Sequence, residues 1–298
     1  MHEPVMVAEV LEHLAPQRGG LFVDCTVGLG GHTRALLEAG ASSVIGFDRD
    51  PGALAEALEV LRPFGERVQL VHADYRRLGE VLNERGIAGV DGLLADLGVS
   101  SMQFDMPGRG FSFRRDEPLD MRMDTTTGPT AADLIGDADE RTLADVIYEF
   151  GEERQSRRIA RAIAAARARA PIATTGQLAD VVRRAMPGRG YTRIDPATRT
   201  FQAIRIWVNR ELEGLDLFLG TAARSLRDGG RMAVISFHSL EDRIVKHTLR
   251  SLQTAGELTI RTKRPLVPSE GEIERNPRAR SAKLRAAARP ELDEMRRA

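Results

Sequence analysis

Short apolar runs alternate with stretches of helical spacing along the first hundred residues of the chain. The runs have the length and the β-branched content of buried strands, and the stretches between them repeat apolar residues every three or four positions. The predicted strands span 21–25, 44–48, 68–72 and 90–97, and the predicted helices 33–39, 52–61 and 78–85. Strands that alternate with helices are typical of a parallel sheet, so the pattern predicts an α/β fold.

The middle of the chain has a different pattern. Residues 104–129 show no period but contain Phe and Met, and residues 130–190 have helical spacing with a capping box at Thr130-x-x-Asp133. From Asp195 a long helix with one apolar face from Phe201 to Leu219 is predicted to return the chain to the sheet. Further strands are predicted at 231–237, 258–262 and 283–289. We therefore expect a core of 1–105 and 195–298, with an inserted loop and all-helical domain at 106–194.

Composition indicates a soluble, cytoplasmic protein. The chain has 298 residues of which 42% are hydrophobic, enough for a substantial core, and no apolar run approaches the roughly 18 residues of a membrane span. The N-terminus lacks a basic and apolar signal sequence. The one cysteine, Cys25, cannot form an internal disulfide and is predicted to fill the core, and no metal site is expected.

Charge is distributed unevenly although 43 basic residues balance 43 acidic ones. Residues 1–150 hold 13 basic and 26 acidic side chains, and the remainder holds 30 and 17. A basic half favours a polyanionic partner, although solvated helix faces also account for many arginines.

A glycine-rich turn follows the first predicted strand. Gly28, Gly30 and Gly31 let the backbone approach a ligand, and the helix that follows presents unpaired N–H groups. A dinucleotide fingerprint would place glycine where this chain has Thr33, so the turn is more similar to that of S-adenosylmethionine-dependent methyltransferases. The alternative is a loop that only needs a left-handed backbone.

Polar residues also follow the other predicted strands. Asp48 lies twenty positions after Gly28, near the spacing at which a carboxylate binds ribose hydroxyls, or else it caps a helix, as Asp50 before Pro51 is predicted to do. Asp96 stands where methyltransferases that alkylate exocyclic amines place an Asp, Asn or Ser as hydrogen-bond acceptor, with Ser100 in the loop that follows. The match is partial, because Leu97, Gly98 and Val99 supply neither the two prolines nor the aromatic residue of that motif. A buried carboxylate satisfied by backbone N–H groups is the alternative for Asp96.

Candidate contacts to a nucleic acid come from the basic residues and their aromatic neighbours. Phe111 and Phe113 could stack on a base or could pack on the core. The arginines of 154–169 could bind phosphate or form a solvated face. His238, at the end of the fifth strand, could face the site or cap the next helix. The RNA-binding candidates are Arg109, Phe113, Arg157, Arg161, Arg199 and His238, together with the linker at 188–193.

Assembled, these motifs resemble the bacterial family that methylates N4 of a cytidine in small-subunit ribosomal RNA. The segments that carry the resemblance span nearly the whole chain. They are His2-x-Pro4-Val5, Asp24-x-Thr26-x-Gly28-x-Gly30-Gly31-His32, Asp48-Arg49-Asp50-Pro51, Asp96-Leu97-Gly98-Val99-Ser100-Ser101, Arg109-Gly110-Phe111-Ser112-Phe113, Leu119-x-Met121-Arg122-Met123, Gly151-x-x-Arg154, Pro196-x-x-Arg199-x-x-Gln202-Ala203, Ile235-Ser236-Phe237-His238-Ser239-Leu240-Glu241-Asp242-Arg243 and Asn276-Pro277-Arg278-Ala279-Arg280.

The resemblance implies a Rossmann-like class I methyltransferase fold, with a mostly parallel twisted sheet interrupted by a helical domain. It implies S-adenosyl-L-methionine as cofactor and 16S ribosomal RNA in a small-subunit particle as partner, while the oligomeric state stays open. The residues that it implies for the cofactor site, beside Gly28 of the turn, are Gly30, Gly31, His32, Asp48, Tyr75, Asp96 and Gln103. Tyr75 would pack against adenine.

The activity that follows is direct methyl transfer to an exocyclic amine. Asp96 would accept a hydrogen bond from the amine and take its proton after alkylation, with Ser100 assisting. N4 lies in the deep, narrow groove of paired RNA, so the target must be unpaired or flipped out. Two alternatives remain: an amine methyltransferase acting on DNA or a small molecule, and a non-catalytic, nucleotide-dependent RNA-binding or assembly protein.

Overall fold

The computed structural model describes residues 4–186 and 195–291, without the side chains of Ser101 and Met102. The chain forms two compact units. The core unit contains 1–98 and 212–298, and the helical unit contains 99–211. The sequence placed the boundaries at 105 and 195, so the structure assigns more residues to the helical unit on both sides.

The core unit is built on a seven-stranded sheet with the order β3-β2-β1-β4-β5-β7-β6. The strands are β1 (Leu21–Asp24), β2 (Ser43–Asp48), β3 (Val68–His72), β4 (Val90–Asp96), β5 (Leu226–Ser236), β6 (Thr259–Ile260) and β7 (Lys283–Ala288). The first five are parallel, and β7 is antiparallel to both β5 and β6. This arrangement confirms the predicted Rossmann-like, mostly parallel fold.

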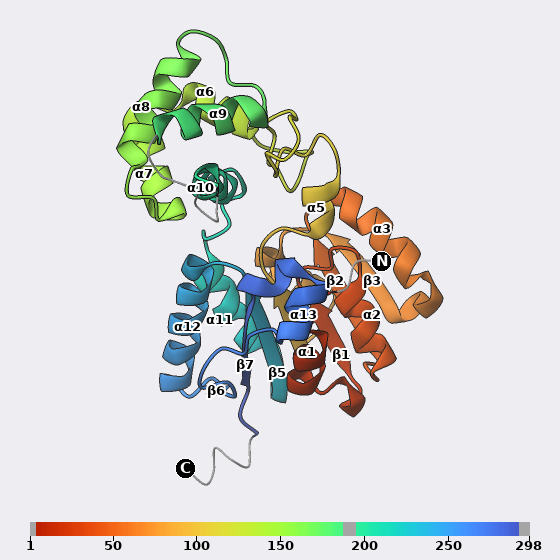
Figure 1. Cartoon of the computed structure of the whole chain (residues 1–298). Helices are drawn as coiled ribbons and strands as arrows, with labels where there is room; N and C mark the ends of the chain where they lie inside the picture. The colour runs from red at the N-terminus through yellow and green to blue at the C-terminus, as the bar shows by residue number, and fades with distance from the viewer. Residues whose placement is uncertain (1–3, 187–194, 292–298) are drawn as a thin grey trace. The chain divides into compact units, whose positions relative to one another are not determined.

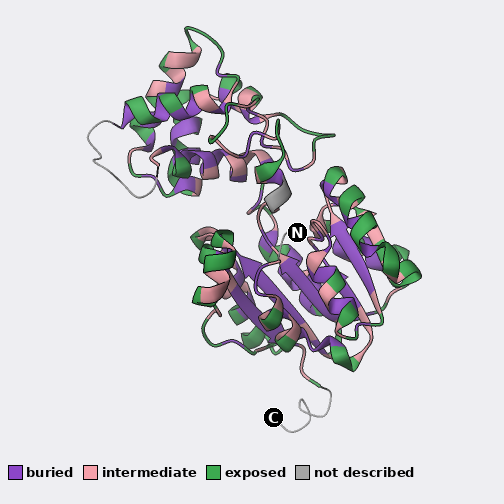
Figure 2. Ribbon diagram, turned by 45° about the vertical axis from the view of Figure 1, so that its right-hand side comes forward, coloured by how far each residue is buried: buried purple, intermediate pink, exposed green. Residues whose placement is uncertain are grey.

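Helices cover both faces of this sheet (Figure 1). The α-helices of the core unit are α1 (Val7–Leu14), α2 (Gly31–Glu38), α3 (Pro51–Leu61), α4 (Leu78–Glu84), α11 (Leu215–Ser225), α12 (Ser239–Thr254) and α13 (Glu270–Arg275). The 3₁₀ turns are η1 (Pro16–Arg18), η2 (Arg62–Arg67), η3 (Tyr75–Arg77) and η4 (Pro277–Ser281). The central strands are buried while the outer helix faces are exposed (Figure 2).

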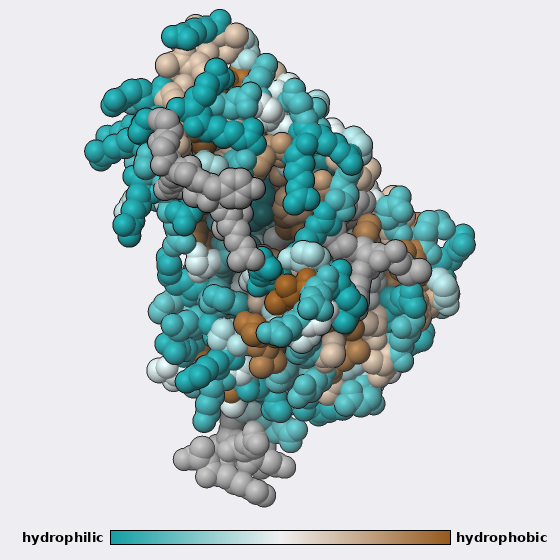
Figure 3. Space-filling model, in the orientation of Figure 1, coloured by the Kyte–Doolittle hydropathy of each residue, from teal (hydrophilic) through white to brown (hydrophobic). Residues whose placement is uncertain are grey.

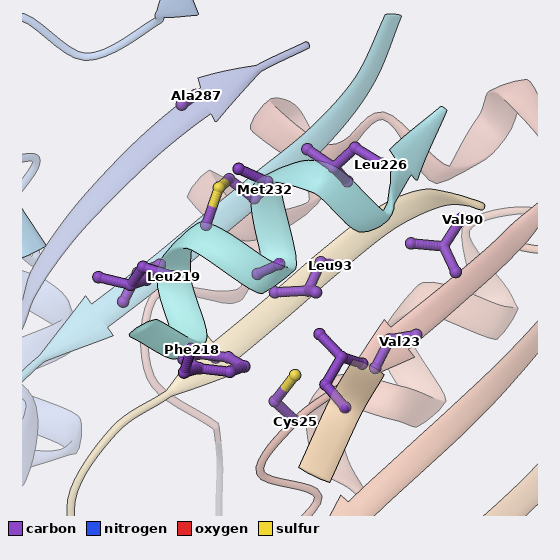
Figure 4. Packing of buried hydrophobic residues seen from close by; sticks show 14 of the residues in the cluster. Val23, Cys25, Val90, Leu93, Phe218, Leu219, Leu226, Met232 and Ala287 are labelled. Carbon is purple, nitrogen blue, oxygen red and sulfur yellow. The ribbon is translucent and has the colours of Figure 1, made fainter. Parts of the chain in front are cut away.

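Neighbouring residues of each central strand enter different hydrophobic clusters. Val23, Leu93 and Met232 pack with Phe218 and Leu219 of α11 on one face (Figure 4). Their chain neighbours Phe22, Leu94 and Ala233 pack on the other face, against α1 and α2. Because side chains alternate across a strand, a sheet covered on both faces needs apolar residues at consecutive positions. This explains the continuous apolar runs from which the strands were predicted.

The helical unit has its own core. Its helices are α5 (Ser101–Asp105), α6 (Ala131–Asp137), α7 (Glu140–Gly151), α8 (Ser156–Arg167), α9 (Thr175–Ala185) and α10 (Ala197–Asn209). Capping boxes begin α6 at Thr130 and α9 at Thr174, the first of which was predicted. The irregular segment before α6 supplies Phe111, Leu119, Met121 and Met123 to the buried cluster. Its apolar residues therefore pack inside the unit.

The long helix predicted from Asp195 to Leu219 is wrong. Arg210 has a left-handed backbone (φ 49°) that ends α10, and α11 begins only at Leu215. Phe201 and Ile204 of α10 pack in the helical unit, whereas α11 packs in the core unit. Apolar residues with one continuous helical spacing thus belong to two separate hydrophobic cores. The spacing of the residues alone does not indicate this division.

Two remaining predictions concern the ends of elements and the membrane. The fifth strand begins at Leu226 rather than Arg231, and β6 has two residues in place of the predicted five. Within residues 4–186 and 195–291, no helix is long and apolar enough to cross a membrane. The linker at 188–193, predicted to contact RNA, lies outside the described residues.

Candidate active site

The candidate site of the core unit lies where β1, β2 and β4 end. The strand order reverses between β1 and β4, and in open α/β sheets ligands bind outside the carboxyl ends of the strands at such a point. Asp24, Asp48 and Asp96 are the last residues of these three strands. The sheet therefore brings to one edge the two predicted site carboxylates, Asp48 and Asp96, and a third, Asp24, that was not predicted as a site residue.

The glycine turn is tightly packed. Gly28 and Gly30 have left-handed backbones (φ 52° and 82°), which confirms the conformational reason for glycine at both positions. A Cβ on Gly31 would lie 2.5 Å from Cγ of Pro4, so the N-terminal segment covers the turn. Gly30 is the N-cap of α2, and no side chain caps this helix. The backbone N–H groups of its first turn are thus available to an anion.

Hydrogen bonds join the ends of β1 and β4. Asp24 is fully buried and accepts hydrogen bonds from the Thr33 hydroxyl (2.7 Å) and from the Thr26 N–H (3.1 Å). The Thr26 hydroxyl accepts one from the Asp96 N–H at 2.7 Å. Burial raises the pKa of Asp24, against the lowering effect of His32 and these hydrogen bonds. Thr33, which in the sequence is only a departure from the dinucleotide pattern, thus holds Asp24 through a hydrogen bond.

His32 and Asp96 meet at this edge. Nε2 of His32 lies 3.5 Å from Oδ2 of Asp96, and the His32 side chain is 6% exposed. Burial lowers the pKa of His32, but the neighbouring carboxylates Asp96, Asp24 and Glu272 outweigh it, and the net shift is upward. Nδ1 of His32 and Oδ1 of Asp96 are buried without a hydrogen-bond partner among the described residues. Both atoms can therefore serve a ligand.

Asp48 joins the glycine turn to β2. Its Oδ2 accepts a hydrogen bond from the Gly28 N–H (2.8 Å), and its Oδ1 accepts one from the Asp50 N–H (2.9 Å). Burial raises the pKa of Asp48 to about 6, since these hydrogen bonds only partly offset the loss of water. Each carboxylate oxygen keeps a second lone pair for a ligand hydroxyl. The capping role belongs to Asp50, which accepts from the N–H groups of Gly52 and Ala53, as predicted.

Tyr75 begins a 3₁₀ turn just after β3. Its ring lies 4.5 Å from the ring of Phe218, and burial raises the pKa of its hydroxyl to about 12. A hydroxyl that stays protonated in an apolar contact is suited to packing, and this agrees with the role that the resemblance implies.

Ser100 and Gln103 belong to the helical unit. The Ser100 N–H donates to Oε1 of Gln103 (3.0 Å), and the Gln103 N–H lies 3.3 Å from the Ser100 hydroxyl. This reciprocal pair caps the short helix α5. Gln103 is buried, and its role toward the cofactor remains a prediction.

Arg109 and Phe113 have structural contacts inside the helical unit. Arg109 donates hydrogen bonds to the carbonyls of Arg122 (3.1 Å) and Met123 (3.0 Å). The ring of Phe113 lies 4.7 Å from that of Phe201, beneath the guanidinium of Arg183. The structure therefore favours the interpretation in which this loop packs inside its own unit over the one in which Phe113 stacks on a base.

Three of the other predicted RNA-binding residues are exposed. Arg157 has no ion-pair partner among the described residues, and Arg161 lies 3.6 Å from Glu140 with a side chain that is 78% exposed. Arg199 is exposed, donates to the Glu152 carbonyl and approaches the buried Glu153. Arg157 and Arg161 thus present their charge to the solvent.

His238 caps α12. Its Nδ1 accepts from the Glu241 N–H, its Nε2 lies 3.1 Å from Oε1 of Glu241, and its side chain is 7% exposed. The structure therefore favours the capping alternative over an RNA contact.

Asp24, Thr26 and Glu272 were not predicted as site residues, although Asp24 and Thr26 belong to a segment that carries the family resemblance. Asp24 closes a strand in the same way as Asp48, so its position was a usable signal. Glu272 accepts a hydrogen bond from the Met6 N–H (2.6 Å) and raises the pKa of His32. No local signal links Glu272 to a site 240 positions earlier in the chain.

Residues 1–290 match the model of a family described as the MraW methylase family. A protein of Geobacter sulfurreducens named "Ribosomal RNA small subunit methyltransferase H" is 52% identical, over 96% of this chain and 98% of its own. Proteins of the same name from Geotalea uraniireducens and Bradyrhizobium diazoefficiens are each 50% identical, over 96% and 97% of this chain and 97% and 91% of their own.

Solved structures with a similar course of the chain include an rRNA methylase from Streptococcus thermophilus. It has a TM-score of 0.42 and 13% identity, over 96% of this chain and 92% of its own. Aeropyrum pernix fibrillarin with bound S-adenosyl-L-methionine has a TM-score of 0.41 and 14% identity, over 94% and 73%.

Proposed function

The chain belongs to the MraW methylase family, and from this premise we propose that it transfers a methyl group from S-adenosylmethionine to N4 of a specific cytidine in 16S ribosomal RNA. The relatives that share half of its residues are named small-subunit ribosomal RNA methyltransferases, and they match almost the full length of the chain. They support an S-adenosylmethionine-dependent ribosomal RNA methyltransferase. The amine and the base rest on the resemblance and on the chemistry of the site.

The pair of His32 and Asp96 is the geometric observation that carries the proposal. Buried polar atoms without hydrogen-bond partners are rare in proteins, and here His32 (Nδ1 and Nε2) and Asp96 (Oδ1) hold such atoms beside an uncapped helix N-terminus. The first-turn N–H groups of α2, next to a His32 whose pKa is raised, suit the carboxylate of the cofactor. The lone pairs of Asp48 suit its ribose hydroxyls, and Tyr75 suits its adenine. The residues present therefore fit the group.

Residues beyond this cluster complete the proposed binding site. Gly28, Gly30 and Gly31 keep the turn free of side chains, and Gln103 is proposed to contact the cofactor. Ser100 is proposed to assist Asp96. The cofactor supplies a methyl group that its sulfonium already activates.

Asp96 has the chemistry that an exocyclic amine requires. The lone pair of the cytosine amine is delocalised into the ring, so the amine is a weak nucleophile and its placement dominates the barrier. Correct alignment of reacting atoms can lower such a barrier by about 7–11 kcal/mol. We propose that Asp96 accepts a hydrogen bond from the amine, which orients the lone pair, and takes the proton once the new N–C bond makes it acidic. The contact with His32 and the hydrogen bond from its own N–H to Thr26 hold Asp96 in place.

The test replaces Asp96 by Asn and measures labelled methyl transfer to 16S ribosomal RNA, with DNA of the same sequence as a second substrate. Asn keeps the shape but cannot take a proton, so we expect the single-turnover rate at saturating cofactor to fall by about 10²–10⁴-fold. Nuclease digestion then identifies the methylated nucleoside.

Binding of S-adenosylhomocysteine, measured by calorimetry, is the control for this variant. Retained binding with lost transfer supports the catalytic role. Near-normal turnover by Asp96→Asn would refute the role of Asp96, and methyl transfer to DNA alone, or N4-methylcytidine absent after incubation with the wild type, would refute the proposed function itself.

A further inference from the structure

We propose that the core unit carries a second RNA contact, a basic groove that binds backbone phosphates of the substrate. The groove lies between α12 and the edge formed by β6 and β7, and its cationic lining residues are Lys246, Arg250, Lys263 and Arg285. The inference rests on the proposed function, because it assumes that the substrate is RNA. None of the RNA-binding residues predicted from the sequence lies in this groove.

Three of the four cations of the groove are unpaired. Lys246, Arg250 and Lys263 have no carboxylate within ion-pair distance among the described residues. Lys246 and Arg250 are four residues apart on α12, so they share one face of that helix. Clustered cations repel one another, and a bound polyanion relieves this repulsion. Hydrophilic residues cover most of the visible surface around α12 (Figure 3).

Asp242 fixes the fourth cation. Its Oδ1 accepts a hydrogen bond from Nε of Arg285 at 2.7 Å, and its Oδ2 lies 3.4 Å from Nζ of Lys283. Burial alone would raise the pKa of Asp242, but Arg285 and Lys283 outweigh it and lower the pKa. A guanidinium oriented through Nε keeps its two terminal amino groups for another acceptor, which is the geometry used for phosphate.

The groove lies close to the catalytic edge within the same unit. Asp96 pairs with Ile235 of β5, and Ile235 pairs with Leu284 of β7, so these three residues form one row across the sheet. Two strand spacings separate the backbones of Asp96 and Leu284 by about 10 Å. Arg285 lies in the next row, paired with Val234, and its side chain is on the face of the sheet that α12 covers, where it contacts Asp242.

Lysine usage supports a phosphate contact at this place. The chain has 43 basic residues but only three lysines, Lys246, Lys263 and Lys283. Two of them line the groove, and the third pairs with Asp242 at its side. The charge of residues 212–298, 17 basic against 12 acidic, is also positive, whereas residues 1–98 have 8 and 15.

The experiment neutralises the three unpaired cations in the full-length protein, as Lys246→Gln, Arg250→Gln and Lys263→Gln together. The matched control neutralises three exposed arginines elsewhere on the core unit, Arg34, Arg62 and Arg77, which have local glutamate partners. Filter binding to 16S ribosomal RNA at about 50–200 mM KCl gives the slope of log Kd against log salt. Three lost phosphate contacts should flatten the slope by about 2, which weakens binding by about 400-fold at 50 mM and by about 25-fold at 200 mM if the two lines meet at about 1 M salt.

Two further measurements separate this inference from the proposed function. Single-turnover transfer at saturating RNA should keep its rate in the groove variant while the RNA concentration for half-maximal rate rises. Calorimetric binding of S-adenosylhomocysteine should not change. If the groove variant binds RNA with the affinity and salt slope of the wild type, the groove does not contact RNA, even if the wild type methylates RNA. An equal loss of affinity in the control variant would also contradict the inference, because the effect would then come from overall charge.

Discussion

At the scale of single residues, the carboxyl edge of the sheet holds buried carboxylates that lower the free energy of unfolding. Asp24 and Asp48 are buried, and burial raises the pKa of both, so each carboxylate costs free energy in the folded protein. Carboxylates with perturbed pKa values that gather at one end of a sheet are candidates for a functional site. Their position agrees with the cofactor site proposed here.

Replacing Asp48 by Asn should change how stability depends on pH. The folded-state pKa of about 6 exceeds the usual value of 3.8, so folding favours the protonated form of Asp48. Its contribution to the free energy of unfolding is complete below pH 3.8 and is lost as the pH rises through 6. The loss approaches about 3 kcal/mol at pH 7. Urea unfolding of both proteins from pH 4 to 7 should show the wild type losing stability relative to Asp48→Asn; a constant difference would contradict the assignment.

At the scale of single residues, the sequence predicts those features that depend on residues close together in the chain. The left-handed turn at Gly28 and Gly30 and the cap at Asp50 follow from neighbouring residues. The bond from the Asp96 N–H to Thr26 spans 70 positions and exists only because β1 and β4 are neighbours in the sheet. No pattern within one strand contains that adjacency.

At the scale of elements, the helix at 195–219 shows why apolar spacing misplaces boundaries. The period continues through Arg210, whose left-handed backbone breaks the helix, and the two parts enter different cores. Arginine rarely adopts this conformation, so the residue type at position 210 did not indicate a break in the helix. By contrast, the capping box at Thr130 was recognisable because it depends on residues three positions apart.

Asn209 fastens the irregular loop to α10. Its Oδ1 accepts from the Met123 N–H and its Nδ2 donates to the Met121 carbonyl, both at 2.7 Å and both buried. Asn209→Ala leaves two buried backbone groups unpaired, so we expect the free energy of unfolding to fall by about 2–4 kcal/mol. Thr198→Ala, at an exposed position of the same helix, is the control. A loss below 1 kcal/mol in denaturant unfolding of Asn209→Ala would show that water replaces the side chain.

At the scale of the whole molecule, the two units divide the charge differently from the two halves of the sequence. The helical unit has 18 basic and 16 acidic residues, so it is nearly neutral, and its basic part is confined to 151–211 with 13 and 5. The second excess lies in 212–298, in the core unit. The basic half identified from the sequence is therefore divided between the two units.

One set of variants can show whether α8 and the groove bind the same RNA molecule at once. Arg157→Gln with Arg161→Gln removes charge from α8, and the triple change at Lys246, Arg250 and Lys263 removes it from the groove. If both surfaces hold the same RNA at once, the pair alone should flatten the salt slope by about 1.4, and the free-energy losses of the pair and the triple should add to within about 0.5 kcal/mol in the combined variant. Filter binding of all four proteins to 16S ribosomal RNA measures both quantities. A combined variant no weaker than the groove triple would mean that α8 makes no contact in the bound state, and the exposed arginines of that helix would then be a solvated face.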